Sequence, residues 1–416
     1  MLSTRPFVVG GLAALLIGLV LVPGPAGAQS SDPTYEVTVA AGALDRRGTV
    51  VSFALPSALP AAAYHLEGPD GTPVPLQVGE TRAWFVLDRL AAGQERTYQV
   101  MEGDVAAAGV GLARQKRSIT LSAGDQPVLR YWTDERPLPR PELDSIYLRG
   151  GYLHPVRTPS GRVVTGDYAE GHPHHHGVWS AWTNTEFRGR TPDFWNMQRG
   201  TGAVVPMALD STWQGPVQAG LTARHRYVDR SAPEPTTALY EEWTVRVYDV
   251  PGADESYRLF DLTVTQTTAS SSPLVLPPYH YGGVAVRGRD AWYGPGNAHF
   301  LTSAGRTRSD GNETRARWTY IGGEVEGRRA GIAMLSHPGN LRAPQPVRIH
   351  PEMPYFCFAP SQLGRWAIEP GRPHVARYRF VVFDGPPDAA RLDRLWADYA
   401  YPPTVTVSRA SSGADS

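Results

Sequence analysis

Short apolar runs separated by turn residues dominate the chain. Because 43 glycines and 38 prolines are spread along it, they divide it into short elements. In 257–268 apolar and polar residues alternate, so one face of that segment is expected to be buried. The runs rich in β-branched and aromatic residues predict strands at Tyr35–Val39, Val50–Leu55, Trp84–Leu87, Thr97–Met101, Ser118–Leu121, Val128–Trp132, Leu239–Val250, Tyr257–Thr268, Gly331–Leu335 and Arg377–Phe383.

One segment has helical spacing. Pro387 suits the first turn of a helix, and the apolar residues that follow fall on one face: Leu392, Leu395, Trp396 and Tyr399. Many strands and one C-terminal helix predict an all-β fold of the sandwich or barrel class. We expect a β-sandwich, with a large supersandwich of the sugar-mutarotase type as one possible form.

The start of the chain has the order of a secretory signal peptide. Arg5 precedes the apolar run 7–22, and Ala26-Gly27-Ala28 predicts cleavage before Gln29. A membrane anchor is the alternative, but the run is short for a span and the cleavage signal follows it directly. No later segment is apolar enough to span a bilayer. We therefore expect an exported protein of the periplasm or extracellular space, with no stable membrane insertion after cleavage.

The composition of the chain changes along its length and suggests how it divides into domains. The Pro-rich segment 136–141 is a plausible domain boundary. It gives a signal peptide at 1–28, an N-terminal β-sandwich-like region at 33–135, a main β-sandwich at 141–402 with the site and the helix, and a disordered polar tail at 403–416.

Charge and cysteine content exclude several functions. Forty basic and forty acidic residues leave no net charge, so nothing favours a nucleic-acid partner. Cys357 is the only cysteine, lies in an apolar run and is expected to be a buried small hydrophobe. The sequence has no GxSxG elbow, HExxH helix, Walker loop or dinucleotide fingerprint, which disfavours serine hydrolases, zincins and nucleotide enzymes.

The densest candidate chemistry is a histidine-rich segment. His154 precedes the run His172-Pro173-His174-His175-His176-Gly177. If 172–176 is extended, His172, His174 and His176 face one side and His175 faces the other. Such histidines could share one divalent metal ion or line a sugar pocket, whereas a surface patch is the alternative. The nearby aromatic residues favour a carbohydrate-binding face: Trp179, Trp182 and Trp195.

Two segments later in the chain contain further candidate site residues. His280 and Tyr281 precede Gly282-Gly283, and two glycines permit close approach of a ligand to the backbone. His337 and Arg342 frame a loop rich in Pro and Gly, and Arg287 could hold a carboxylate or sugar hydroxyls.

Several motifs in order resemble one bacterial family, labelled PmoA-like after a methane oxygenase. They are the segment 151–161, the HPHHHGVW run 172–179, Asp193-Phe194-Trp195, Tyr281-Gly282-Gly283 with Arg287, the segment 337–344, and Tyr378-Arg379-Phe380 with Asp384-Gly385. The resemblance covers most of 145–400. In that family the position of His176 is commonly Arg or another polar residue. Oxygenase subunits of that name are polytopic membrane proteins, so the resemblance implies an exported family associated with carbohydrate catabolism instead.

These observations predict a carbohydrate-active lyase, epimerase or hydrolase that uses histidine acid/base chemistry, with a metal as an optional electrophile. A non-catalytic glycan-binding protein and a metal-dependent oxygenase are the alternatives. We expect the residues around His172–His175, His280, His337 and Arg342 to converge. The catalytic candidates are His174, His175, His280, His337, Arg287 and Arg342; the substrate-binding candidates are His154, Trp179, Trp182, Trp195 and Tyr281; the candidate metal ligands are His172 and His174.

Overall fold

The computed structural model describes residues 35–250 and 256–410. Almost all regular structure in these ranges is antiparallel β-sheet, with one α-helix, α1 (Ala389–Ala400). The predicted all-β class and the single C-terminal helix are confirmed, and every predicted strand coincides with an observed one to within a few residues. The expected signal peptide, 1–28, lies outside the described residues.

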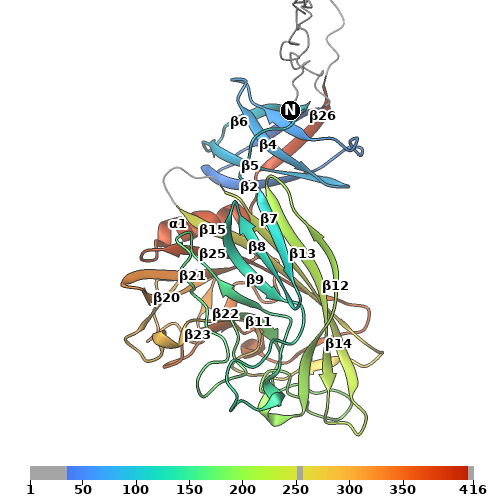
Figure 1. Ribbon diagram of the computed structural model, residues 1–416, viewed down its shortest axis with the longest axis vertical. Helices are drawn as coiled ribbons and strands as arrows, with labels where there is room; N and C mark the ends of the chain where they lie inside the picture. The colour runs from blue at the N-terminus through green and yellow to red at the C-terminus, as the bar shows by residue number, and fades with distance from the viewer. Residues whose placement is uncertain (1–34, 251–255, 411–416) are drawn as a thin grey trace, which may run out of the picture.

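A seven-stranded sheet forms one end of the molecule (Figure 1). Its core contains the inward-facing residues of an alternating pattern, such as Val37 and Val39 of β1. In sheet order the strands are β2 (Arg46–Ala54), β5 (Arg82–Leu90), β4 (Pro73–Val78), β3 (Tyr64–Glu67), β6 (Glu95–Glu102), β1 (Tyr35–Ala40) and β26 (Thr404–Arg409).

Two larger sheets pack face to face as a sandwich. The nine-stranded sheet has the order β19 (Arg315–Ala316), β22 (Gln345–Ile349), β23 (Tyr355–Phe358), β17 (Gly283–Arg287), β11 (Val178–Ala181), β10 (Leu153–Val156), β9 (Gln126–Trp132), β8 (Ser118–Ala123) and β7 (Val110–Gln115). The eight-stranded sheet has the order β12 (Gly202–Trp213), β13 (Gln218–Asp229), β14 (Thr236–Tyr248), β15 (Tyr257–Thr268), β25 (His374–Asp384), β21 (Arg328–Ser336), β20 (Trp318–Val325) and β18 (Ala298–Thr302).

Short elements complete the fold. A two-stranded sheet pairs β16 (Leu274–Leu276) with β24 (Trp366–Ile368). Among the described residues, four 3-10 turns lie in the connections: η1 (Ser145–Tyr147), η2 (Met197–Arg199), η3 (Asp290–Trp292) and η4 (Pro360–Leu363). In the described ranges no helix is long and apolar enough to cross a membrane.

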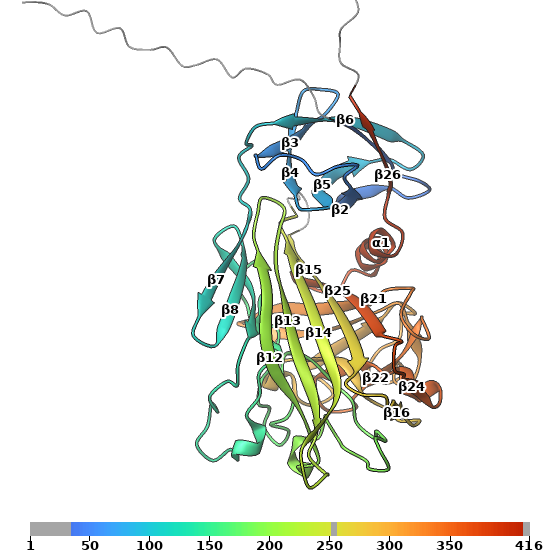
Figure 2. The same ribbon diagram turned by 90° about the vertical axis from the view of Figure 1, so that its right-hand side faces the viewer.

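Two expectations about the domains were wrong. Strands β7, β8 and β9 belong to the sandwich, so the N-terminal unit ends near Glu102 and not at the predicted 136–141 boundary. Residues 404–409 of the expected disordered tail form β26, which pairs with β1 (Figure 2). The alternating Val405 and Val407 pack against the N-terminal core, a pattern too short and polar to identify from sequence alone.

Helix α1 lies between the N-terminal sheet and the sandwich (Figure 2). Asp388 caps its first turn by accepting from the Arg391 N–H at 3.2 Å. The apolar residues Leu392 and Leu395 are buried against both units, as the one-sided pattern predicts. Its Asp398 forms a buried ion pair with Arg46 of β2 at 2.9 Å.

The two faces of the nine-stranded sheet have different roles. In β23, Phe356 and Phe358 join the core between the two sheets, whereas Tyr355 and Cys357 belong to a separate aromatic cluster on the opposite face. Cys357 is fully buried, as expected. Because side chains alternate along a strand, this opposite face presents a second set of side chains, and the candidate site lies there.

Candidate functional site

The histidine segment is a turn and not an extended strand. The His175 N–H donates to the His172 carbonyl at 2.9 Å, and Pro173 occupies the second position of the turn, which its fixed φ favours. The expected alternation of side chains is therefore wrong. The turn brings the rings of His172, His174 and His175 together, with centroid separations of 4.6 to 5.8 Å.

His176 points to a different partner. Its Nδ1 lies 2.6 Å from Asp167 Oδ1, and Tyr152 donates to the other carboxylate oxygen at 2.9 Å. Burial raises the pKa of Asp167, but the hydrogen bond and charge of His176 and the charge of Arg136 outweigh it and lower that pKa. Burial also lowers the pKa of His176, against the opposing effect of Asp167. This buried pair anchors the loop that carries the turn.

Gly177 explains how the turn reaches the sheet. A Cβ at this position would lie 2.2 Å from the Leu153 carbonyl oxygen, so only glycine permits the close approach. The Gly177 carbonyl accepts the Arg287 N–H at 2.8 Å, which fixes the turn beside β17.

Arg287 supplies the charge at the floor of the site. Its side chain is only 1% exposed, and its Nη2 donates to Asp290 Oδ1 at 3.1 Å. Its Nη1 lies 3.5 Å from His175 Nδ1. A guanidinium has no acceptor, so in this long contact Nδ1 of His175 is the accepting atom.

The histidines of the turn are neutral bases at neutral pH. Burial, followed by the charges of neighbouring histidines and Arg287, lowers the pKa of His175 well below its usual value. The same causes lower the pKa of His174 to about 3. The Nδ1 atoms of His172 and His174 are buried with no hydrogen-bond partner among the described residues. These two ring nitrogens are therefore not occupied by another described residue.

An aromatic wall surrounds these imidazoles. The His175 ring centroid lies 5.3 Å from that of Trp179, 6.2 Å from Trp195 and 5.0 Å from Tyr355. Tyr281 packs edge-on against Trp195 at 5.1 Å. Trp179, Trp195 and Tyr281 were predicted to contact substrate, and the structure brings all three to the histidine turn or its immediate surroundings.

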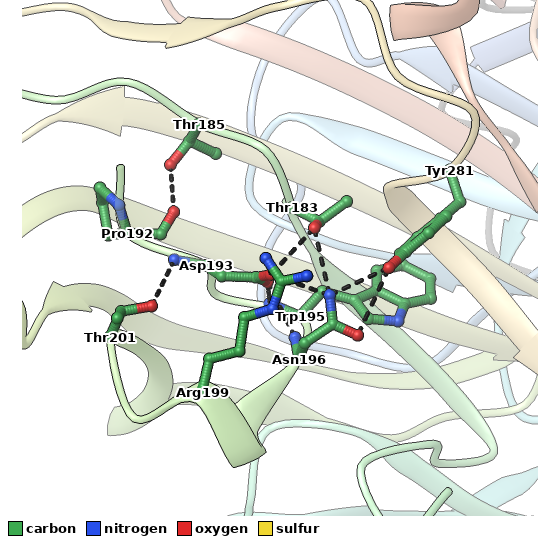
Figure 3. A network of polar contacts seen from close by, with 9 residues as sticks. All are labelled: Thr183, Thr185, Pro192, Asp193, Trp195, Asn196, Arg199, Thr201 and Tyr281. Carbon is green, nitrogen blue, oxygen red and sulfur yellow. Dashed lines mark hydrogen bonds and ion pairs between the residues drawn. The ribbon is translucent and has the colours of Figure 1, made fainter. Parts of the chain in front are cut away.

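A carboxylate holds part of this wall in place (Figure 3). Asp193 Oδ1 accepts the backbone N–H groups of Trp195 and Asn196 at 3.0 and 2.9 Å. Its Oδ2 accepts from Thr183 at 3.1 Å and from the Asn196 amide at 2.8 Å. The same amide donates to the Tyr281 hydroxyl at 3.0 Å. One buried carboxylate thus couples the positions of Trp195 and Tyr281.

Three other candidates lie around the cluster without joining it. His154 Nδ1 pairs with Thr165 Oγ1 at 3.0 Å, and burial lowers its pKa to about 4. Trp182 donates from Nε1 to Gln266 at 2.8 Å and does not line the turn. His280 is exposed, with its ring 4.8 Å from Tyr281, so it reaches the rim of the site.

The expected convergence fails for His337 and Arg342. The His337 ring packs against Tyr399 of α1 at a centroid distance of 5.2 Å. Arg342 donates to the carbonyls of Pro360 and Gly364 at 2.6 and 2.8 Å. The partners of both residues thus lie outside the histidine turn, in α1 for His337 and around η4 for Arg342.

Sequence reasoning missed residues that the fold brings here. Tyr355 and Arg348 face the same side of the sheet as Arg287, and His350 lies 5.6 Å from the Tyr355 ring. Asp193 stands in the Asp-Phe-Trp motif, so a carboxylate two residues before a candidate tryptophan was the one available signal. For Tyr355 and Arg348, only the strand pairing reveals their place.

The expected metal site gains no support from the geometry. Within 35–250 and 256–410, no group of three or more His, Cys, Asp or Glu side chains is placed to hold a metal ion. His172, His174 and His175 lie close together, but their side chains do not form such a group.

Comparison with solved structures shows likeness to two chains from Enterococcus faecalis. One is a protein in glycosyl hydrolase family 38, with 9% identity and a TM-score of 0.43 over 90% of this chain and 47% of that chain. The other is an alpha-mannosidase, with 10% identity and a TM-score of 0.44 over 90% of this chain and 46% of that chain. This chain therefore spans less than half the length of either.

No curated protein matches the sequence. A family model does match, over residues 118–397, and the matched range contains most of the motifs described above. The match does not confirm the PmoA-like label that those motifs suggested. The family is described only as one of unknown function, and by this match the chain belongs to it: DUF6807.

Proposed function

We propose that the protein is an exported carbohydrate-active enzyme whose chemistry is proton transfer by the histidine turn. The observation that carries this proposal is the contact between His175 and the buried guanidinium of Arg287. It fixes a positive charge beside His175, whose ring lies 4.6 Å from that of His174, and the Nδ1 of His174 has no partner among the described residues. Aromatic rings line the same place, and such rings suit the apolar faces of sugars.

Each residue of the proposed site has a separate role in the reaction. The imidazole of His174 takes a proton from a sugar carbon next to a carbonyl group, because the lone pair of His175 Nδ1 already faces Arg287. The electron pair moves onto the carbonyl oxygen, and Arg287 stabilises the resulting negative charge. Return of the proton to the opposite face gives epimerisation, whereas loss of a group from the next carbon gives elimination. Arg342, the other predicted charge stabiliser, is occupied by backbone carbonyls and has no part in this scheme.

A glycan-binding protein without turnover is the second candidate. The observation in its favour is the burial of the two candidate bases, since His174 is 4% exposed and His175 is 3% exposed. A sugar held only by the rim, at Tyr281 and His172, would not reach them.

Solvent deuterium tests the proposal. The mature chain is incubated in heavy water with a panel of neutral and acidic oligosaccharides, and mass spectrometry follows deuterium at carbon and new products. We expect turnover with deuterium incorporation for at least one glycan, and a loss of roughly 10²–10⁴-fold for His174→Ala. His337→Ala is the matched control and should retain activity, because His337 packs against α1. Glycan binding without turnover would reject the enzyme in favour of the second candidate.

A further inference from the structure

Two arginines lie on the site face of the nine-stranded sheet. Strand pairing sets Arg287 opposite Tyr355 and sets Arg348 opposite Cys357. Because paired residues and residues two apart share a face, both guanidiniums lie on the same side as the Tyr355 ring. The two arginines therefore flank the aromatic wall of the site from two different strands.

Neither guanidinium uses all of its donors. Arg287 contacts His175 and Asp290 through its Nη atoms, and Arg348 donates from Nη1 to Asn312 at 3.2 Å. The Nε of each is buried with no partner in the described part of the chain. Buried donors are normally satisfied, so each arginine keeps one N–H group that no described residue accepts.

The charge balance at this face is positive. Burial, then the charges of Arg348, His172, Arg287 and Arg308, lower the pKa of His350 to about 4. Arg308 also braces the segment through the carbonyl of His350 at 3.1 Å.

The carboxylates near the two arginines are exposed, so their charges are screened more strongly than the buried charge of Arg287. The Asp290 side chain is 46% exposed, and Glu313 and Glu352 are exposed too. Water and salt screen exposed charges far more than buried ones, whereas Arg287 is 1% exposed. Asp290 therefore compensates the buried charge of Arg287 only in part.

We infer that the glycan bound by this site carries an oxyanion group, a carboxylate or a sulfate, which Arg287 and Arg348 hold while its ring lies against the aromatic wall. This inference rests on the proposed function for the sugar part of the ligand. An arginine presents paired N–H donors that match the two oxygens of a carboxylate. A neutral sugar would leave the buried charge of Arg287 with one anionic partner, the Asp290 carboxylate, which is 46% exposed.

Calorimetric titration with three matched probes tests the inference: a galacturonate trisaccharide, the corresponding sulfated galactose trisaccharide and the neutral galactose trisaccharide. We expect an acidic probe to bind at least roughly 10-fold more tightly than the neutral one, since hydrogen bonds to charged groups are the stronger ones. Rising salt should weaken only the acidic probe. The acidic probe that binds identifies the carboxylate or the sulfate.

Variants then test which positive charge holds the anionic group of the probe. Arg348→Gln should weaken the acidic probe roughly 10-fold or more and leave the neutral one unchanged. Arg329→Gln is the control, because Arg329 is exposed on β21. The salt dependence of the unmodified protein keeps the inference testable if Arg348→Gln does not fold.

The outcomes separate this inference from the proposed function. Equal affinity for acidic and neutral probes, or no binding of any of them, overturns the inference, even if a neutral glycan is turned over. Preferential binding of an acidic probe without turnover supports the inference and rejects the enzyme.

Discussion

Replacing Asp193 tests whether one carboxylate organises the aromatic wall. Asp193 is 2% exposed, and Asp193→Ala would remove the acceptor of the Trp195 and Asn196 backbone N–H groups. A buried donor left without a partner costs about 1–3 kcal/mol. Two such donors, partly relieved by relaxation and water, predict a loss of about 3–5 kcal/mol in the free energy of unfolding.

The assay is urea unfolding followed by tryptophan fluorescence. Because Trp195 follows the lost carboxylate and packs on Trp179 at 4.9 Å, its emission should shift to the red in the folded variant. Glycan affinity should fall as well, since the Asn196 amide positions the Tyr281 hydroxyl.

A neighbouring variant controls for general loss of charge. Arg199 pairs with Asp193 at 3.1 Å, but its side chain is 60% exposed. Arg199→Gln should therefore cost no more than about 1 kcal/mol, as exposed ion pairs do. The reasoning would be refuted by an Asp193→Ala protein that unfolds within about 1 kcal/mol of the parent and keeps its emission spectrum.

Three further predictions follow from other parts of the structure. Cys357→Ala should cost about 1 kcal/mol of stability through lost packing and leave activity within a few-fold, because burial raises the thiol pKa to about 12; complete loss of activity at an unchanged Tm would contradict this. His174 has its folded pKa lowered to about 3, so the unfolded chain binds more protons below its usual pKa; stability should be full above about pH 6.5 and fall as the pH drops toward 3, and His174→Gln should flatten that slope in thermal melts. A stop after Tyr401 removes β26, exposes the edge of β1 and should speed proteolysis within 35–102, whereas a stop after Ala410 should not; equal proteolysis of the two chains would show that β26 is dispensable.

Strand positions were predictable because they depend on local patterns. The alternation in 257–268 buries Phe260, Leu262 and Val264 of β15 in the core between the sheets, and the one-sided apolar residues of 387–399 become α1. Which strands pair is a different matter. Thr404–Arg409 is polar and short, and it becomes a strand only because β1 offers it an edge.

The candidate site was predictable in part for the same reason. His172, His174 and His175 stand together in the chain, so any fold keeps them close. The turn at Pro173 decided which way the rings point, and it sent His176 to Asp167. The alternation of side chains expected for an extended segment does not predict these directions, because Pro173 at the second turn position reverses the chain.

By itself, the sequence determined the all-β class, the terminal helix, the buried Cys357 and the clustering of His172, His174 and His175, because each depends on residues that are neighbours in the chain. Only the tertiary structure decided that Arg287, Arg348 and Tyr355 share one face of the sheet with that turn. It also decided that His337 and Arg342 lie elsewhere. The physical reason is that a strand fixes which of its side chains share a face, whereas hydrogen bonding between strands distant in the chain fixes which faces meet.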